Sequence, residues 1–173
     1  ETDFVPVSLI GNVPELLIAH PSAPFDTLDG MLKYAKANPG KLSYSSAGIG
    51  TLPHITMELL LRQAGLQVTH VAYKGAAPAL QDVIGGHVQM MFATAASVIG
   101  LIKDGKVRAL AVTTPKRTAL LPDIPTVDEL GIKGFDATTW HGLVAPSGTP
   151  KEVVDTLTFA VNSALKDPAT QKA

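Results

Sequence analysis

The sequence contains no cysteine, which excludes disulfide bonds, thiolate catalysis and cysteine-ligated zinc together. Aromatic residues make up only 5% of the chain, and this scarcity disfavours aromatic cages and base-stacking surfaces. Neither sign of charge is in excess, because 14 Lys and Arg stand against 15 Asp and Glu, a formal net charge of -1. A nucleic-acid-binding surface normally appears as a basic excess, so we expect no nucleic-acid partner.

Long apolar runs are missing too, since no stretch reaches the roughly 18 consecutive apolar residues of a membrane-spanning helix. Residues 1–4 lack the basic start and apolar run of a signal peptide. The chain does have ample core-forming material, with 46% hydrophobic and 17% charged residues, which is typical of a folded globular protein. Strand-like sequence almost at its start and a helix almost at its end indicate a piece of a longer protein.

Between residues 41 and 113, strand-like and helix-like segments alternate. The strands are expected at 41–45, 68–72, 88–92 and 107–113, and the helices at 51–64, 76–84 and 97–103. Alternation of this kind is typical of parallel strands joined by right-handed helical crossovers. The sequence therefore predicts the α/β class.

The flanking segments are more varied. Residues 5–20 resemble a strand interrupted at Gly11 and Asn12, and the helix that follows is expected to be capped by Asp26. Further elements are a short helix at 127–130, a strand at 137–145 and a last helix after a capping box, Thr149 to Glu152, with Pro150 at its first position. The periodicity leaves open whether this tail joins the sheet or belongs to a second domain.

The best candidate for chemistry is the small-residue loop 45–51, which follows a strand and opens a helix. The first amides of a helix have no internal partner and carry partial positive charge. Gly48 and Gly50 leave the backbone open and Ser46 and Thr51 add hydroxyl groups, so the loop favours a carboxylate or phosphate. The spacing matches neither a dinucleotide fingerprint nor a P-loop, and a tight turn that merely needs small residues is the alternative.

Two other strand-to-helix junctions are weaker candidates. Tyr73, Lys74 and Gly75 offer a hydroxyl, a charge and open backbone, or form an ordinary surface loop. In the segment 92–97, Thr94 suits a helix cap better than a ligand contact. His54 lies one turn into the helix after the glycine loop, where it either faces a ligand or hydrogen-bonds the loop, and we favour the second.

An enzymatic reading would pair Ser46 with His54 in a hydrolase. The sequence has no Gly-x-Ser-x-Gly elbow, and no pair of carboxylates shares a visible partner. No two histidines stand three or four residues apart, so there is no compact metal motif. The residues indicate a binding site without catalytic machinery, and we expect neither a cofactor nor a metal.

Segments that run in order through most of the chain resemble one family, the periplasmic substrate-binding receptors of tripartite tricarboxylate transporters, also called the Bug family. The matching segments are 3–9, 37–42, 46–51 with His54, 71–80, 103–113, 121–127 and 142–150. The resemblance implies a periplasmic protein that captures a small carboxylate, either an organic acid or an amino acid, and delivers it to membrane transporter subunits. A ligand-sensing adaptor that uses the same pocket is the alternative.

The resemblance also implies a two-lobed clamshell with a mixed, mostly parallel sheet covered by helices on both faces, from which the N-terminal part is absent here. Residues 14–121 would form the second ligand-binding lobe. Residues 1–13 and 122–173 would supply hinge strands and partial elements of the first lobe. Self-association through these exposed first-lobe elements is a further expectation, because unprotected strand edges tend to pair.

For the ligand site, the resemblance carries the loop 46–51 and the Tyr73–Gly75 junction over to this chain. The family commonly has Phe-Asp-Asn where this sequence has Phe92-Ala93-Thr94, and a polar residue where it has Ile49. These departures leave the identity of the ligand open. The resulting candidate ligand-binding residues are Ser46, Ala47, Gly48, Gly50, Thr51, His54, Tyr73, Gly75, Thr94 and Ala95.

Overall fold

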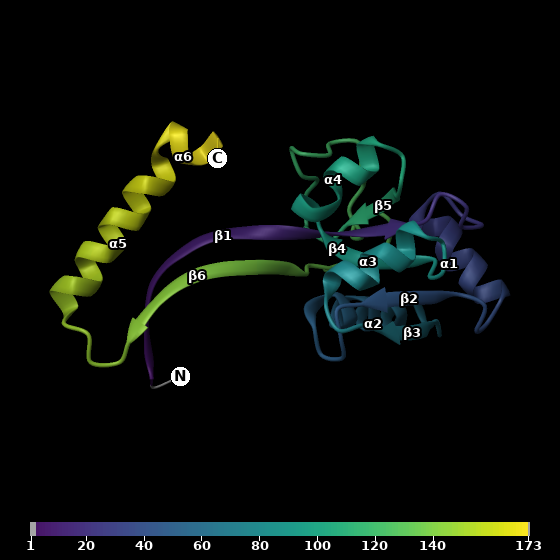
Figure 1. The fold of residues 1–173 in the computed structure, drawn as a ribbon, viewed down its shortest axis with the longest axis horizontal. Coiled ribbons are helices and arrows are strands. Elements are labelled where there is room, and N and C mark those ends of the chain that lie inside the picture. The colour runs from purple at the N-terminus through teal and green to yellow at the C-terminus, as the bar shows by residue number, and fades with distance from the viewer. Residues whose placement is uncertain (1–2, 173) are drawn as a thin grey trace. The chain divides into compact units, whose positions relative to one another are not determined.

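The computed structural model describes residues 3–172 of the chain (Figure 1). Contacts between Cα atoms divide the chain into two compact units. Unit one comprises residues 1–12 and 140–173, and unit two comprises residues 13–139. Strand β1 (Phe4–Ala19) runs through the boundary without a break, so Gly11 and Asn12 do not interrupt the strand as expected.

Unit two is built on a mixed sheet. Its strands lie in the order β3-β2-β4-β1-β5, with β2 at Ser43–Ser46, β3 at Thr69–Ala72, β4 at Met90–Thr94 and β5 at Arg108–Val112. Strand β2 runs parallel to both β3 and β4, whereas β1 is antiparallel to its neighbours β4 and β5. The predicted α/β class with a mixed sheet is confirmed.

Helices cover both faces of this sheet, and the alternation of side chains along β1 explains how. Leu17 and Ala19 point into an apolar cluster with α1 (Leu28–Ala37) and α2 (Leu52–Ala64). Leu16 and Ile18 point the other way, into a cluster with α3 (Ala76–Ile84) and α4 (Ala95–Lys103). A strand buried on both faces needs the continuous apolar sequence that residues 16–19 provide.

Unit two extends past Leu121, the boundary expected for the second lobe, to Thr139. Val127 and Phe135 are buried in the same cluster as α1 and α2, which ties this segment to unit two. The helix expected at 127–130 is wrong, because the segment makes only turns. Thr126 and Glu129 cap each other reciprocally, but Gly131 follows with a φ of 104°, which ends the turn before a helix can extend.

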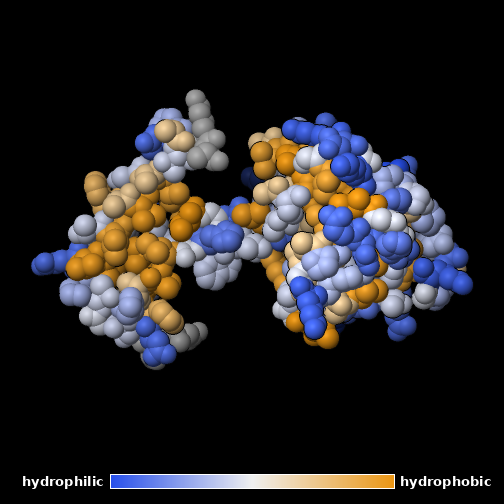
Figure 2. Space-filling model, in the orientation of Figure 1, coloured by the Kyte–Doolittle hydropathy of each residue, from blue (hydrophilic) through white to orange (hydrophobic). Residues whose placement is uncertain are grey.

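Unit one contains the first part of β1, most of β6 (Thr138–Pro146), α5 (Lys151–Lys166) and α6 (Pro168–Lys172). Strand β6 pairs with β1, and Thr158 on α5 donates a hydrogen bond to the carbonyl of Val7 at 3.0 Å. Although α5 has an apolar face, none of its described residues is buried. Figure 2 shows apolar surface over this helix, where Phe159 is 76% exposed.

Two helix starts differ from the sequence-based expectation. Thr27 rather than Asp26 caps α1, accepting a hydrogen bond from the Gly30 amide at 3.0 Å. The capping box at α5 does not form, because the Thr149 hydroxyl donates to the carbonyl of Pro146 at 2.7 Å instead. Among the described residues, no helix combines the length and the apolarity needed to cross a membrane.

Candidate ligand-binding pocket

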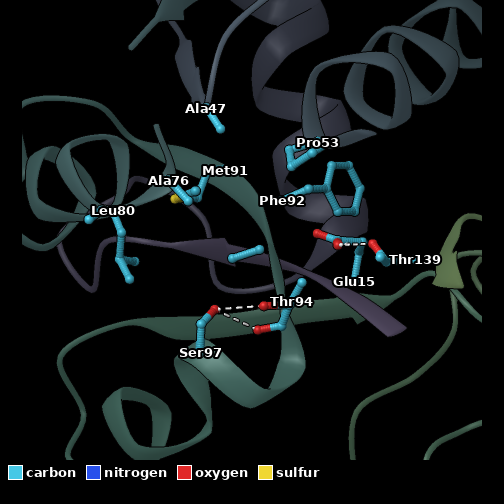
Figure 3. Close-up of a pocket in the computed structure, with 12 residues that line it drawn as sticks. Glu15, Ala47, Pro53, Ala76, Leu80, Met91, Phe92, Thr94, Ser97 and Thr139 are labelled. Atoms are coloured by element: carbon cyan, nitrogen blue, oxygen red, sulfur yellow. Dashed lines mark hydrogen bonds between the residues drawn. The ribbon is translucent and has the colours of Figure 1, made fainter. Parts of the chain in front are cut away.

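Unit two contains a cavity of about 460 Å³ at the carboxyl ends of β2 and β4 (Figure 3). This is the edge at which ligands bind in open α/β sheets. Most of its surface is apolar, and its polar side chains are one carboxyl and three hydroxyl groups. The cavity is lined by Glu15, Ala47, Pro53, Ala76, Ala77, Leu80, Met91, Phe92, Ala93, Thr94, Ser97 and Thr139.

The N-termini of α2, α3 and α4 all contribute to this lining, through Pro53, Ala76 with Ala77, and Thr94 with Ser97. At none of these three N-caps does a side chain accept a hydrogen bond from the helix amides. Each helix therefore presents partial positive charge without a side-chain acceptor. Convergence of three such ends favours an anionic group in the cavity.

In the glycine loop, by contrast, the polar groups hydrogen-bond one another. The Ser46 hydroxyl is fully buried, lies 2.7 Å from Nε2 of His70 and accepts a hydrogen bond from the Gly48 amide. The hydroxyl and amide of Thr51 both donate to the carbonyl of Gly48, at 2.7 and 3.3 Å. The Gly50 amide donates to Nδ1 of His54 at 3.2 Å, so His54 bonds the loop, as favoured from the sequence.

The rings of Tyr44, His70 and His54 stack beside this loop. His70 lies between His54 and Tyr44, with ring centroids 4.3 and 4.7 Å away, and the Tyr44 hydroxyl donates to Glu58 at 2.6 Å. Burial and the neighbouring His54 lower the pKa of His70, which favours the neutral ring. The histidine beside Ser46 is thus His70 and not His54. Among the described residues, no carboxylate forms a hydrogen bond with the His70 ring. The geometry gives no support to the Ser46–His54 hydrolase.

The Tyr73–Gly75 junction is also engaged internally. The Tyr73 hydroxyl donates a short hydrogen bond to Asp82, which raises the pKa of Tyr73. Gly75 caps α3 with a φ of 121°, and its amide donates to the carbonyl of Ala47 at 3.0 Å. The junction therefore holds the glycine loop against α3 rather than lining the cavity.

The structure thus brings two of the candidate residues, Ala47 and Thr94, into the lining of the cavity. Thr94 is the N-cap of α4, and its hydroxyl donates to Ser97 at 3.0 Å. Ala95 is buried at the first position of α4. The other candidates form the surrounding scaffold and do not line the cavity: Ser46, Gly48, Gly50, Thr51, His54, Tyr73 and Gly75.

Sequence reasoning missed Glu15, which among the described residues is the only ionisable side chain that lines the cavity. It is 1% exposed, and its Oε1 accepts a hydrogen bond from the Thr139 hydroxyl at 3.2 Å. Its Oε2 has no hydrogen-bond partner in the described part of the chain. Burial raises the pKa of Glu15, and the bond from Thr139 opposes this only in part. The signal was available, because Glu15 stands two residues before Leu17, on the same face of a strand.

Metal ligation finds no support in residues 3–172, where no group of three or more His, Asp or Glu side chains is arranged to hold an ion. The cavity is lined instead by apolar side chains, by the first turns of three helices and by one carboxyl group. A mixed α/β sheet with such a cavity at its strand ends is the architecture of one lobe of a solute-binding protein.

The whole chain, residues 1–173, matches the family model described as "Tripartite tricarboxylate transporter family receptor". A relative from Pseudomonas sp., described as "UPF0065 protein in tcbD-tcbE intergenic region", is 40% identical over 174 residues, covering 100% of this chain and 52% of that protein. The chain therefore belongs to the tripartite tricarboxylate transporter receptor family. It spans about half the length of the curated relatives that it matches.

Solved structures agree with this assignment. The R. palustris protein Rpa4515 with adipate has a TM-score of 0.88 and 36% identity, over 98% of this chain and 56% of that one. The periplasmic binding protein BugD has a TM-score of 0.85 and 40% identity, again over 98% and 56%. The expected family, which is a family of transporter receptors, and the periplasmic-binding-protein fold are thereby confirmed.

Proposed function

We propose that this chain forms the ligand-binding part of a periplasmic receptor that captures a small carboxylate and delivers it to membrane transporter subunits. The observation that carries the proposal is the convergence of three uncapped helix N-termini on one apolar cavity. A carboxylate would accept hydrogen bonds from the first amides of α3 and α4, while its carbon chain would lie against Leu80, Met91 and Phe92. The α2 residue in the lining is Pro53, which has no N–H, so this helix would act through its dipole alone.

The glycine loop then has a supporting role. Its hydrogen bonds to His54, to His70 and to the Gly75 amide fix where α2 and α3 begin. Fixed helix starts keep the donor groups in place before the ligand arrives, which reduces the entropy lost on binding. In this proposal Ser46, Gly48, Gly50 and Thr51 act on affinity through the helix ends rather than through direct contact.

The identity of the ligand is proposed from the apolar lining and from the relative that carries adipate. An aliphatic dicarboxylate combines an anionic end for the helix N-termini with methylene groups that suit the cavity. We further propose that unit two corresponds to the second lobe of the family's clamshell, and that unit one supplies hinge strands and elements of the first lobe. Closure of two lobes around the ligand would complete the site.

The direct test is calorimetric titration of the protein with adipate and with hexanoate. Ala77→Asp places a negative charge at the first turn of α3 inside the cavity, where it satisfies the helix end and repels an anion. We expect this variant to fold and to bind both ligands at least about tenfold more weakly.

A matched control is Ala119→Asp, which adds the same charge at an exposed residue that does not line the cavity. Its affinity for both ligands should equal that of the unmodified protein. Absence of binding by the unmodified protein, or equal affinity of the Ala77→Asp variant, would refute the proposed function.

A further inference from the structure

The unpartnered oxygen of Glu15 requires an explanation. A buried polar atom without a hydrogen bond costs about 1–3 kcal/mol, so such atoms are uncommon unless a ligand or another group completes them. Glu15 lines the cavity and is itself 1% exposed, and Figure 3 shows its carboxyl group beside Phe92 and Pro53. Ala76 and Leu80 lie on the other side of the same cavity in this view.

Hydrogen bonding around Glu15 distinguishes its two oxygens. Oε1 accepts from the hydroxyl of Thr139, which is the role of a carbonyl oxygen in a neutral carboxylic acid. In the neutral acid the proton would therefore lie on Oε2, which has no acceptor among the described residues. A neutral Glu15 therefore presents an O–H donor to the cavity.

The surroundings favour this neutral form. The residues opposite Glu15 in the sheet are Thr94 on β4 and Thr113, which directly follows β5, and neither is ionisable. None of the other described residues that line the cavity is ionisable. Burial is the main cause of the raised pKa of Glu15, and no neighbouring charge contributes to it.

We infer that Glu15 is a specificity-determining residue of this cavity, and that it contacts the ligand as a neutral acid whose Oε2 donates to a ligand carboxylate oxygen. This inference rests on the proposed function, because it assumes that a carboxylate ligand occupies the cavity. It adds that a second carboxylate is recognised on the Glu15 side, away from Ala76 at the N-terminus of α3. An ammonium group at that position would meet a donor rather than an acceptor and would bind poorly.

Three ligands of equal carbon count separate the possibilities: adipate, hexanoate and 6-aminohexanoate. They carry a carboxylate, a methyl group and an ammonium group, respectively, at the far end of the chain. We expect the protein to bind adipate best. Glu15→Gln keeps a donor in the same place, so it should bind adipate within about threefold of the unmodified protein, whereas Glu15→Ala should lose about tenfold or more.

Hexanoate serves as the internal control, because it lacks the second carboxylate and its affinity should not change in either variant. The affinity for adipate should also fall as pH rises through the raised pKa of Glu15 in the folded protein, since Glu15 must then take up a proton to bind. Glu15→Gln cannot ionise and should show no such fall. Circular dichroism and thermal unfolding verify that both variants are folded.

The inference is overturned if Glu15→Ala binds adipate as well as the unmodified protein does, or if the adipate affinity of the unmodified protein is independent of pH. It is also overturned if 6-aminohexanoate is preferred and Glu15→Gln abolishes that preference, because Glu15 would then act as an ionised acceptor. Failure of the unmodified protein to bind hexanoate and adipate alike would instead refute the proposed function, and this inference with it.

Discussion

The glycine loop and the cavity beside it differ in whether their polar groups are hydrogen-bonded within the protein. In the loop, Ser46, Thr51 and His54 hydrogen-bond to other protein groups, and Ser46 is fully buried. In the cavity, three helix ends have no side-chain cap and Oε2 of Glu15 has no hydrogen-bond partner among the residues that the structure describes. A polar group that is already hydrogen-bonded to another protein group contributes to stability but is not free to bind a ligand. The difference therefore indicates that the loop stabilises the fold and that the groups in the cavity remain available for a ligand.

The largest effect expected from this comparison is on the loop. Gly48 has a φ of 140°, which L side chains rarely adopt, and a Cβ there would lie 3.4 Å from the carbonyl of Tyr73. Gly48→Ala should lower the free energy of unfolding by about 2–3 kcal/mol. Gly50 has a φ of 81° and open space around it, so Gly50→Ala should cost only about 1 kcal/mol. Urea denaturation measures the free energy of unfolding of both variants. Equal decreases would show that the contact with the Tyr73 carbonyl adds no strain at Gly48.

The next largest expected effect is an increase in stability. Glu15→Gln should stabilise the protein by about 1–2 kcal/mol at neutral pH, because it removes a carboxyl group whose ionised form is disfavoured by burial. The pKa of Glu15 is raised in the folded state, so its destabilising effect is absent below the ordinary value of 4.5. It develops as pH rises from there through the folded-state pKa. Denaturation at neutral and at acidic pH should show the gain disappear in acid, and a gain that persists there would contradict this account.

A smaller effect is expected at Thr139, which makes the one hydrogen bond recorded for the Glu15 carboxyl group in the described structure. Thr139→Val keeps the shape of the side chain and removes the donor. The variant should lose about 1 kcal/mol of stability. It should lose no stability beyond the measurement error in a Glu15→Leu background, where no acceptor remains. A full additional loss in the double variant would mean that Thr139 acts through packing and not through Glu15.

The smallest effect on stability, and a separate effect on association, is expected in unit one. Phe159 is 76% exposed on α5, a helix without buried residues, so Phe159→Ser should change the free energy of unfolding by less than about 0.5 kcal/mol. Self-association through unit one remains a prediction, and this variant should reduce it. Light scattering at increasing protein concentration measures the molecular mass of the unmodified protein and of the Phe159→Ser variant. Identical masses for the two would exclude Phe159 from any such interface.

Local sequence predicted the regular elements of unit two well. The helix α3 was expected at its observed bounds, because Gly75 and Gly85 delimit an apolar periodic segment. Errors arose where a side chain had two possible partners. Thr149 had the sequence of a capping residue but bonds Pro146. The short helix expected at 127–130 is only a turn, in which Thr126 and Glu129 cap each other before Gly131. Local propensity does not decide between such partners, since both are close in sequence.

The site residues expected from the sequence and the lining of the cavity overlap only at Ala47 and Thr94. The sequence indicated the strand-to-helix junctions at 45–51, 73–76 and 92–97, and the N-termini of the three helices that follow them do line one cavity. It did not indicate that the glycine loop would satisfy itself through His54 and His70. The partners of Ser46 depend on the pairing of β2 with β3, which sets Tyr44 beside His70.

The sequence by itself determined the α/β class, because apolar periodicity and glycine placement act over short distances along the chain, and its ordered segments carried the resemblance to the family. Only the tertiary structure decided which polar groups remain free. Glu15 faces the cavity because β1 enters the sheet between β4 and β5, antiparallel to both. This strand joins residues more than seventy positions apart in sequence, such as Glu15 and Thr94. Hydrogen-bond satisfaction is a property of such distant neighbours, so it could not be predicted from sequence spacing.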